Sequence, residues 1–425
     1  MAKLLIRNGR VIDPANNIDR VTDVLLANGL VRAVGENLPA RGADEYDATG
    51  KIVAPGFIDM HVHLREPGFE SSETIETGAK CAAVGGFTSI ACMPNTNPVN
   101  DTAHLTRYIL ERARSTAKVN VFPIGAITKG SQGEELASIG AMRDAGAVAI
   151  SDDGRPVMNS RVMRRAMEIA ASFNIPVIDH CEDINLSAGG DMNESDVSLK
   201  LGLRGIPACS EDVMVARDIL LQEVTGVHFH VAHLSTKNAL AMVREAKRRG
   251  MKVTCEITPH HFAIHDGEMI PYDSNYRMKP PIRCNHDVAA MIGGLKDGTI
   301  DAIATDHAPH SVTDKMQEFE RCPFGILGLE TAIGLTLEHL VDPGHITLKR
   351  MIELFTTGPA NILRLNRGAL TPGLPGDVTV LDLDDTWTYE VAKSPSKSRN
   401  SPFDNKQFKG RAIATIVSGE IVWRT

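Results

Sequence analysis

The sequence is poor in aromatic residues and lacks any long apolar run. Aromatic side chains make up 4% of its 425 residues, and no window approaches 18 uninterrupted apolar positions, so no membrane-spanning helix is expected. The first residues, Met1–Gly9, reach a charge and a turn too early for a signal peptide. Lysine and arginine number 45 against 53 acidic residues, a net charge of −8, which argues against nucleic acid or a membrane surface as a partner.

Cysteine is scarce and scattered. The seven cysteines are odd in number and contain no C-x-x-C pair, which argues against a disulfide framework and a thiolate zinc site. We therefore expect the reducing cytoplasm as the compartment. Hydrophobic residues at 43% and charged residues at 23% are typical of a globular protein with a large core, and they exclude wholesale disorder.

Both ends of the chain show short apolar runs separated by turns. The predicted strands at the amino end are Lys3–Arg7 and Arg10–Ile12 around Asn8-Gly9, then Val21–Leu26 and Leu30–Val34 around Asn28-Gly29. Those at the carboxyl end are Val378–Asp382, then Ile413–Val417 and Ile421–Trp423, which form a predicted hairpin around Ser418-Gly419. We predict that residues 1–54 and 370–425 form one small β-sandwich domain, because chain termini often lie close together. The polar stretch Ala392–Asn405 is predicted to be a surface loop.

Residues 55–369 have a different pattern, in which apolar runs alternate with amphipathic helical stretches. The eight strand candidates are Gly56–Leu64, Thr88–Met93, Asn120–Ala126, Ala147–Asp152, Pro176–His180, Val227–His233, Lys252–Ile257 and Asp301–Thr305. The expected helices are Ser72–Val84, Ala103–Ser115, Glu134–Asp144, Ser160–Phe173, Glu211–Thr225, Lys237–Arg249 and Asp287–Asp297. This alternation predicts an α/β fold with a closed (β/α)8 TIM barrel. A doubly wound open sheet is the alternative.

The feature in excess is histidine, with 15 residues, and its position matters more than its number. Catalytic residues of such barrels lie at the carboxyl ends of the strands. Five predicted strand ends carry histidine or aspartate: His61 and His63, Asp153, His180, His233, and Asp306. Imidazole and carboxylate suit zinc and similar ions. Six ligands suit two metals that share a bridging carboxylate and hydroxide, polarise a carbonyl and supply a nucleophile.

Each of these residues also has a structural interpretation. A single histidine at a strand end is most often a hydrogen-bonded rim residue, and Asp152-Asp153 could cap a following helix. His228 and His230 lie earlier in their strand and are interpreted as structural. The pair His260-His261 is assigned to packing or to support of the ligands. The convergence of five strand ends on one rim favours the metal site.

These residues lie in motifs that resemble the amidohydrolase superfamily and, within it, the long bacterial type of the dihydroorotase family. The matching stretches, which span most of the chain, are Asp59–Gly68, Gly85–Pro98, Ser151–Pro156, Asp179–Asp183, His233–Thr236 and Ala304–His310. The resemblance implies two zinc ions. His61 and His63 bind one with Asp153 and Asp306, while His180 and His233 bind the second with Asp153 bridging. Many relatives bridge with a carbamylated lysine, but this chain has Asp153 there.

The resemblance also implies a reaction: reversible cyclisation of N-carbamoyl-L-aspartate to (S)-dihydroorotate in de novo pyrimidine biosynthesis. Asp306 is the implied general acid and base. The implied substrate contacts are His63, Arg65, Asn95, Lys279, His310, Phe324 and Gly325, with Arg65 suited to a carboxylate. One departure concerns Lys279, which stands before Pro280-Pro281 where the family usually has asparagine. The Lys279 side chain could still donate a hydrogen bond there, now with a positive charge, or it could point away.

Two other functions stay open at this stage. A hydantoinase or allantoinase would share the superfamily chemistry, although Arg65, Asn95 and Asp153 argue against it. A non-catalytic partner of aspartate transcarbamoylase would belong to another class, but such chains lose metal ligands and this one has all six. The resemblance also implies a homodimer and leaves open a complex with aspartate transcarbamoylase.

Overall fold

The computed structural model describes residues 3–425, and its central strands are short, apolar and buried. They form two parallel ladders, in the orders β6-β7-β8 and β14-β13-β12-β9. Their bounds are β6 Phe57–Val62, β7 Phe87–Cys92, β8 Asn120–Pro123, β9 Val177–Asp179, β12 Phe229–Val231, β13 Val253–Ile257 and β14 Ala302–Ile303. Strands covered on both faces are continuously apolar, which explains why the sequence pattern located them.

The fourth predicted strand, Ala147–Asp152, is wrong, because these residues do not form a strand. The segment nevertheless occupies the expected place in the ring, between β8 and β9. Ile150 alone makes parallel bridges, to Gly125 and to Val177, and thereby connects β8 with β9. Just beyond it, the Asp152 side chain replaces the backbone as the partner of the neighbouring segment, since its carboxylate accepts the Ile127 backbone N–H at 2.8 Å. A further bridge between Val62 and His307 closes the ring. The predicted (β/α)8 barrel is therefore confirmed, and the open sheet is excluded.

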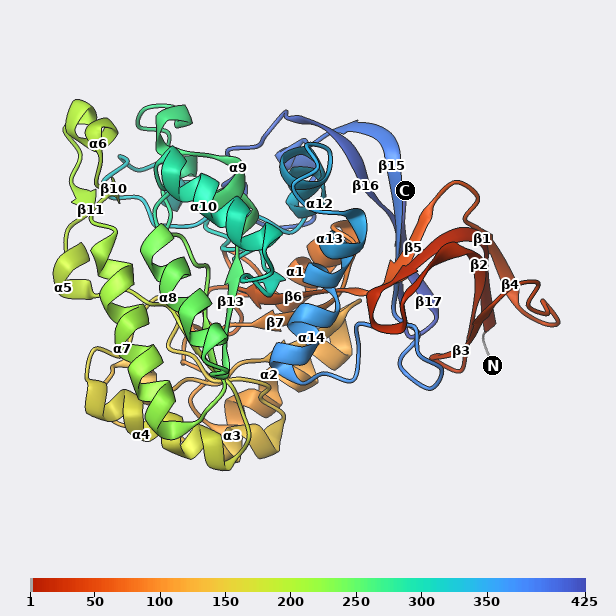
Figure 1. Ribbon diagram of the computed structural model, residues 1–425, viewed down its shortest axis with the longest axis horizontal. Coiled ribbons are helices and arrows are strands. Elements are labelled where there is room, and N and C mark those ends of the chain that lie inside the picture. The colour runs from red at the N-terminus through yellow and green to blue at the C-terminus, as the bar shows by residue number, and fades with distance from the viewer. Residues whose placement is uncertain (1–2) are drawn as a thin grey trace.

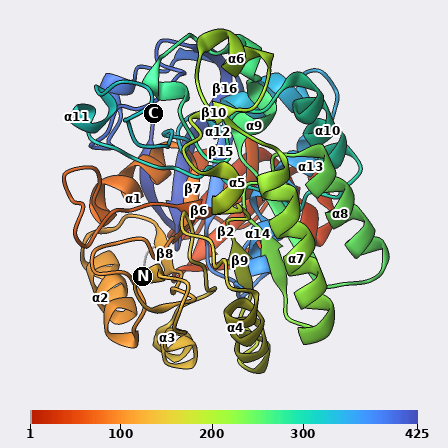
Figure 2. The ribbon, with the colours of Figure 1, turned by 90° about the vertical axis from the view of Figure 1, so that its left-hand side faces the viewer.

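Helices surround these strands, as Figure 2 shows for α1, α2, α4, α7 and α8. The larger ones are α1 Ile75–Val84, α2 Ala103–Thr116, α3 Ile139–Ala145, α4 Ser160–Ser172, α7 Cys209–Thr225, α8 Lys237–Arg248, α10 Asn285–Lys296, α13 Leu348–Phe355 and α14 Thr357–Leu363. Shorter ones are α5 Ile184–Ser187, α6 Asp196–Leu201, α9 Pro259–Ala263, α11 Val312–Lys315 and α12 Ala332–Thr336. No helix within residues 3–425 has both the length and the apolar character needed to cross a bilayer.

A second sheet, beside the barrel in Figure 1, combines both ends of the chain. Its strands are β1 Lys3–Asp13, β2 Ile18–Ala27, β3 Leu30–Gly35, β4 Asp44–Asp47, β5 Ile52–Pro55, β15 Val378–Thr388, β16 Gln407–Val417 and β17 Glu420–Arg424. The two ends meet where β5 pairs antiparallel with β15. The sheet packs around an apolar cluster of its own that includes Leu26, Val53 and Val380. The domain boundaries at residues 54 and 370 stay a prediction.

The predicted hairpins of this sheet have different outcomes. Those around Asn28-Gly29 and Ser418-Gly419 are confirmed as β2-β3 and β16-β17. The one around Asn8-Gly9 is wrong, because β1 continues through it and pairs with β2 along its whole length, with a register shift between Ile6 and Gly9. Asn8 takes a positive φ of 59°, and a Cβ at Gly9 would lie 2.4 Å from Val53. The pair therefore makes a bulge that passes close to β5.

The stretch Ala392–Asn405, between β15 and β16, is not the surface loop that its polarity predicted. Ser396, Ser398 and Asn400 are at most 2% exposed. The Ser398 hydroxyl donates to the Ser72 carbonyl at 2.7 Å, and the Ser396 hydroxyl donates to Glu73. Polar residues can be buried where each finds a hydrogen-bond partner, so this segment packs against the barrel.

Candidate active site

Six predicted ligands are brought together at the carboxyl ends of the barrel strands. His61 lies in β6, and His63 follows it directly. His180 and His233 follow β9 and β12, Asp153 follows the bridge at Ile150, and Asp306 follows β14. All six are buried. Parallel strands end on the same rim, which is why residues from 61 to 306 meet there.

Asp153 lies at the centre of this cluster. Its Oδ1 atom lies 3.4 Å from His61 Nε2, 3.7 Å from His180 Nδ1 and 3.6 Å from His233 Nε2. Its Oδ2 atom lies 3.5 Å from His63 Nε2. One carboxylate therefore contacts histidines of both proposed ligand sets, which is the arrangement that a bridging ligand requires.

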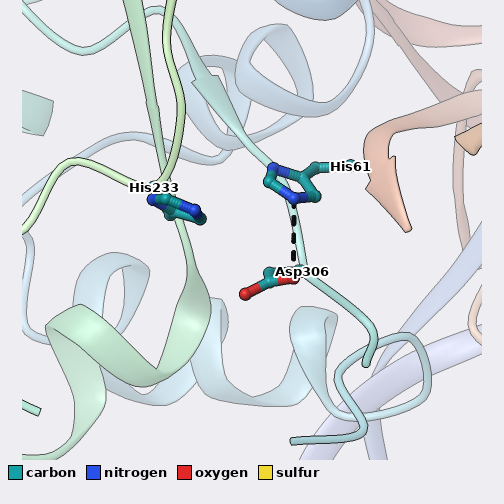
Figure 3. Close-up of side chains that lie close together, drawn as sticks. All are labelled: His61, His233 and Asp306. Atoms are coloured by element: carbon teal, nitrogen blue, oxygen red, sulfur yellow. Dashed lines mark ion pairs between the residues drawn. The ribbon is translucent and has the colours of Figure 1, made fainter. Parts of the chain in front are cut away.

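Asp306 reaches the cluster from the carboxyl end of β14, the strand that lies next to β6 in the closed ring. Its Oδ1 atom lies 2.9 Å from His63 Nε2 and 3.5 Å from His61 Nε2. Figure 3 shows the His61 ring directed toward the Asp306 carboxylate, with His233 beside them. Asp306, His233 and Arg65 have positive φ values of 48°, 30° and 60°. Non-glycine residues rarely take this conformation, and such strain concentrates at functional sites.

The cluster fits divalent metal ions. Among residues 3–425, the buried atoms His61 Nε2 and Asp153 Oδ1 have no hydrogen-bond partner, a costly arrangement unless another group satisfies them. Their separation of 3.4 Å suits two ligands that each lie about 2 Å from one ion. The candidate ligand atoms form three groups of three residues each. Within each group the atoms lie within 4.8 Å of one another, and together the groups contain all six residues.

The electrostatics keep the two carboxylates ionised. Burial alone would raise the pKa of Asp306, but the His61 and His63 imidazoles outweigh it and lower that pKa. Burial is likewise opposed at Asp153, where His61 and His233 hold the pKa well below its usual value. Both side chains are therefore acceptors at neutral pH, as metal ligands and a general base must be.

Two glutamates behind the histidines were missed from the sequence. Glu256 accepts a hydrogen bond from His61 Nδ1 at 2.6 Å. Although burial raises the pKa of Glu256, the His61 and His230 rings lower it to about 2. A carboxylate behind a ligating histidine fixes its orientation and increases its basicity. The available signal was one acidic residue in the otherwise apolar end of the strand Lys252–Ile257.

The second glutamate, Glu182, explains the position of Lys279. His180 Nε2 donates to Glu182 Oε2 at 2.8 Å, and Lys279 Nζ donates to Glu182 Oε1 at 2.7 Å. The Lys279 ammonium also lies 5.0 Å from the centre of the Phe324 ring. Lys279 thus lines the cavity while its charge is paired with the carboxylate that orients His180. The motif Asp179–Asp183 contained Glu182, but no role was predicted for it.

A cavity of about 510 Å³ opens above the cluster. Its lining includes every predicted site residue except His61, namely His63, Arg65, Asn95, Asp153, His180, His233, Lys279, Asp306, His310, Phe324 and Gly325. Arg65 Nε donates to the Pro309 carbonyl at 3.0 Å, and His63 Nδ1 donates to Asn95 Oδ1 at 2.9 Å. The arrangement places a guanidinium at one wall of the cavity and the ligand cluster at its base.

Four other histidines lie near the rim, and three of them bond other groups of the protein. His230 Nδ1 bonds the Thr254 hydroxyl at 2.8 Å. His261 bonds the Pro280 carbonyl at 3.0 Å, and burial lowers the pKa of His260 to about 3. His310 stays neutral as well, because burial and the Arg65 charge lower its pKa to about 2. Its Nε2 donates to the Phe324 carbonyl at 2.8 Å.

Comparison with known proteins agrees with this geometry. Residues 50–239 match a family model described as dihydro-orotase-like. A curated dihydroorotase from Solibacter usitatus is 66% identical, over 99% of this chain and 98% of its own. One from Geobacter metallireducens is 51% identical over 99% of both chains. Among solved structures, an L-hydantoinase (dihydropyrimidinase) from Arthrobacter aurescens has a TM-score of 0.89 at 25% identity, covering 100% of this chain and 96% of that one.

The barrel, the terminal sheet and the histidine–aspartate cluster define a hydrolase of the amidohydrolase superfamily. Structural likeness alone does not separate its subclasses, since the neighbour just described is a hydantoinase. Sequence identity over the full length does separate them, and this chain belongs to the dihydroorotase family. The sequence-based recognition is therefore confirmed, and the hydantoinase alternative gains no support over it.

Proposed function

We propose that this chain catalyses the reversible cyclisation of N-carbamoyl-L-aspartate to (S)-dihydroorotate and water, with two zinc ions held by the six ligands. The observation that carries the proposal is one cavity that places the Arg65 guanidinium beside the Asp153-centred cluster. A guanidinium is the natural partner of a substrate carboxylate. Zinc, when bound, polarises the reacting carbonyl and lowers the pKa of a coordinated water.

The residues of the chain have separate proposed roles in metal binding and proton transfer. His61 and His63, with Asp153 and Asp306, are proposed to hold one ion, while His180 and His233, with Asp153 shared, hold the other. In ring opening, the Asp306 carboxylate accepts the proton of the attacking water. It then delivers that proton to the amide nitrogen as the ring C–N bond breaks. Cyclisation follows the same steps in reverse.

The substrate carboxylate is assigned to the opposite wall. Arg65 supplies the charge. Its Nε is fixed on the Pro309 carbonyl and its Nη2 lies 3.3 Å from His310 Nε2, so the orientation of the guanidinium is set before a ligand binds. Asn95, His63 and His310 line the same cavity and are proposed to contact the carboxylate end of the substrate, while Phe324 and Gly325, also in the lining, are proposed to contact its ring. Lys279 is proposed to act from its pair with Glu182 rather than as a replacement for the family's asparagine.

The test pairs metal analysis with substrate comparison on the purified full chain. We expect about two zinc ions per chain, loss of activity on chelation, and turnover of dihydroorotate far above that of hydantoin or allantoin. A preference for hydantoin would contradict the proposed substrate. A folded chain without metal or turnover would instead support the non-catalytic partner of aspartate transcarbamoylase.

The expected partners and compartment belong to the same proposal. A homodimer, and a complex with aspartate transcarbamoylase, can be checked by sedimentation of the chain alone and mixed with that enzyme. All seven cysteines, each within residues 3–425, are free thiols, which supports a reducing compartment such as the cytoplasm.

A further inference from the structure

The buried segment between β15 and β16 brings one side chain to the wall of the cavity. Asn400 belongs to the carboxyl-terminal part of the chain and is 2% exposed. Its Nδ2 group donates to the Ala308 carbonyl at 2.9 Å and to the Gly325 carbonyl at 3.0 Å. Its Oδ1 atom accepts the His310 backbone N–H at 3.1 Å. Both amide protons and the amide oxygen are therefore used on backbone groups.

These backbone groups belong to two segments of the cavity lining, residues 308–310 and 323–325, which we call the carboxylate wall because Arg65 is anchored on it. Ala308 and His310 flank Pro309, whose carbonyl accepts from Arg65 at 3.0 Å. The segments also touch directly, since a Cβ at Gly325 would lie 2.8 Å from both Cβ and O of Ala308. The Asn400 amide thus joins both segments at the point where the Arg65 guanidinium is anchored.

We propose that Asn400 is a positioning residue for substrate binding: from the carboxyl-terminal segment, it fixes the Pro309 carbonyl and the His310 and Gly325 backbone that orient Arg65 and the cavity wall. It touches neither the six metal ligands nor the reacting atoms. The inference rests on the proposed function, because it assigns to Asn400 a part in carboxylate recognition. A displaced guanidinium would bind the substrate carboxylate less tightly in the ground state and the transition state alike, so the effect should appear in KM.

The experiment compares Asn400→Ala and Asn400→Asp with the unmodified chain, using dihydroorotate as substrate. Asn400→Asp has the same shape and keeps the acceptor for His310, but its carboxylate faces two carbonyls. We expect both variants to raise KM about tenfold or more, with kcat within about threefold and full metal content. Loss of binding alone, without loss of the chemical step, produces this split.

Ser398→Ala is the matched control, because it removes one buried hydrogen bond of the same segment, to Ser72. It should lower the thermal midpoint and leave KM unchanged. The proposal would be overturned if both Asn400 variants had the same KM as Ser398→Ala and the unmodified chain. It would also be overturned if the Asn400 variants lost kcat and metal together. Failure of both Asn400 variants to fold would also overturn it, in favour of a purely structural role. An unmodified chain that does not turn over dihydroorotate would contradict the proposed function itself.

Discussion

The two halves of the cavity are constructed differently. In the metal half, side chains from strand ends point at one centre, and carboxylates directly behind them, such as Glu256 on His61, fix their orientation. In the carboxylate half, the wall consists of backbone near residues 308–310 and 323–325. Side chains from outside these two segments hold that backbone, among them Asn400 and Lys315.

The difference suggests a division of function. Strand ends inherit rigidity from the barrel ladders, so the metal half should control metal affinity and the chemical step. The loop segments have no ladder of their own and depend on a few buried polar contacts. Changes there should alter substrate binding and leave the metal in place. Perturbing each half separately tests whether the division is real.

The largest effect is expected from Asp306→Ala, in the metal half. Removal of the proposed proton carrier and ligand should lower kcat by about 10³-fold or more. It should also reduce metal content, measured by elemental analysis of the purified variant. Asp306→Asn keeps the shape without the charge and serves as the control for packing. Near-normal rates in either variant would show that another group moves the proton.

The next largest effect is expected from Arg65→Ala, in the carboxylate half. Its loss should lower kcat/KM for dihydroorotate by about 10²-fold, mainly through KM, because it leaves the substrate charge without its partner. Metal content should be unchanged. Arg65→Lys retains the charge but loses the Nε–H that bonds the Pro309 carbonyl, so an intermediate value is expected. If Arg65→Ala also loses metal, the two halves are not separable.

Glu256→Gln tests the support behind the metal half. Replacing a carboxylate that orients a ligating histidine typically weakens metal affinity 10–100-fold. The measurement is a competition titration with a chelator, followed by activity at saturating zinc, which should largely recover. Glu330→Gln is the control, since Glu330 bonds Cys81 and Ser394 away from the cluster. An unchanged affinity would assign Glu256 to packing alone.

The same division explains what could be predicted from sequence. His61, His63 and Asp306 could be placed together because strand ends of a barrel meet on one rim, a rule that needs only the strand pattern. Asn400 could not, because its partners lie 75 to 92 residues away and its polar surroundings indicated an exposed loop. Asn8-Gly9 was misinterpreted for a similar reason, since its contact with Val53 of β5 is not a local feature.

The smallest effect concerns Lys315, which lies beneath the carboxylate wall. Its Nζ donates to the carbonyls of Pro323 at 3.0 Å and Gly325 at 3.3 Å, and burial lowers its pKa to about 8. An unfolded lysine titrates near 10.4, so between about pH 8 and 10 the unfolded chain binds more protons than the folded one. Stability from this group therefore rises with pH across that window.

Lys315→Met removes this linkage and isolates it from other titrating groups. Between pH 7.5 and 9.5, the unmodified chain should gain about 2 kcal/mol in free energy of unfolding relative to the variant, measured by urea unfolding at both pH values. A constant difference would mean that Lys315 titrates as an exposed lysine does. The expected gain would instead show that, below about pH 8, a buried and desolvated Lys315 ammonium group holds the carboxylate wall. The strand ends differ, because their rigidity comes from backbone ladders.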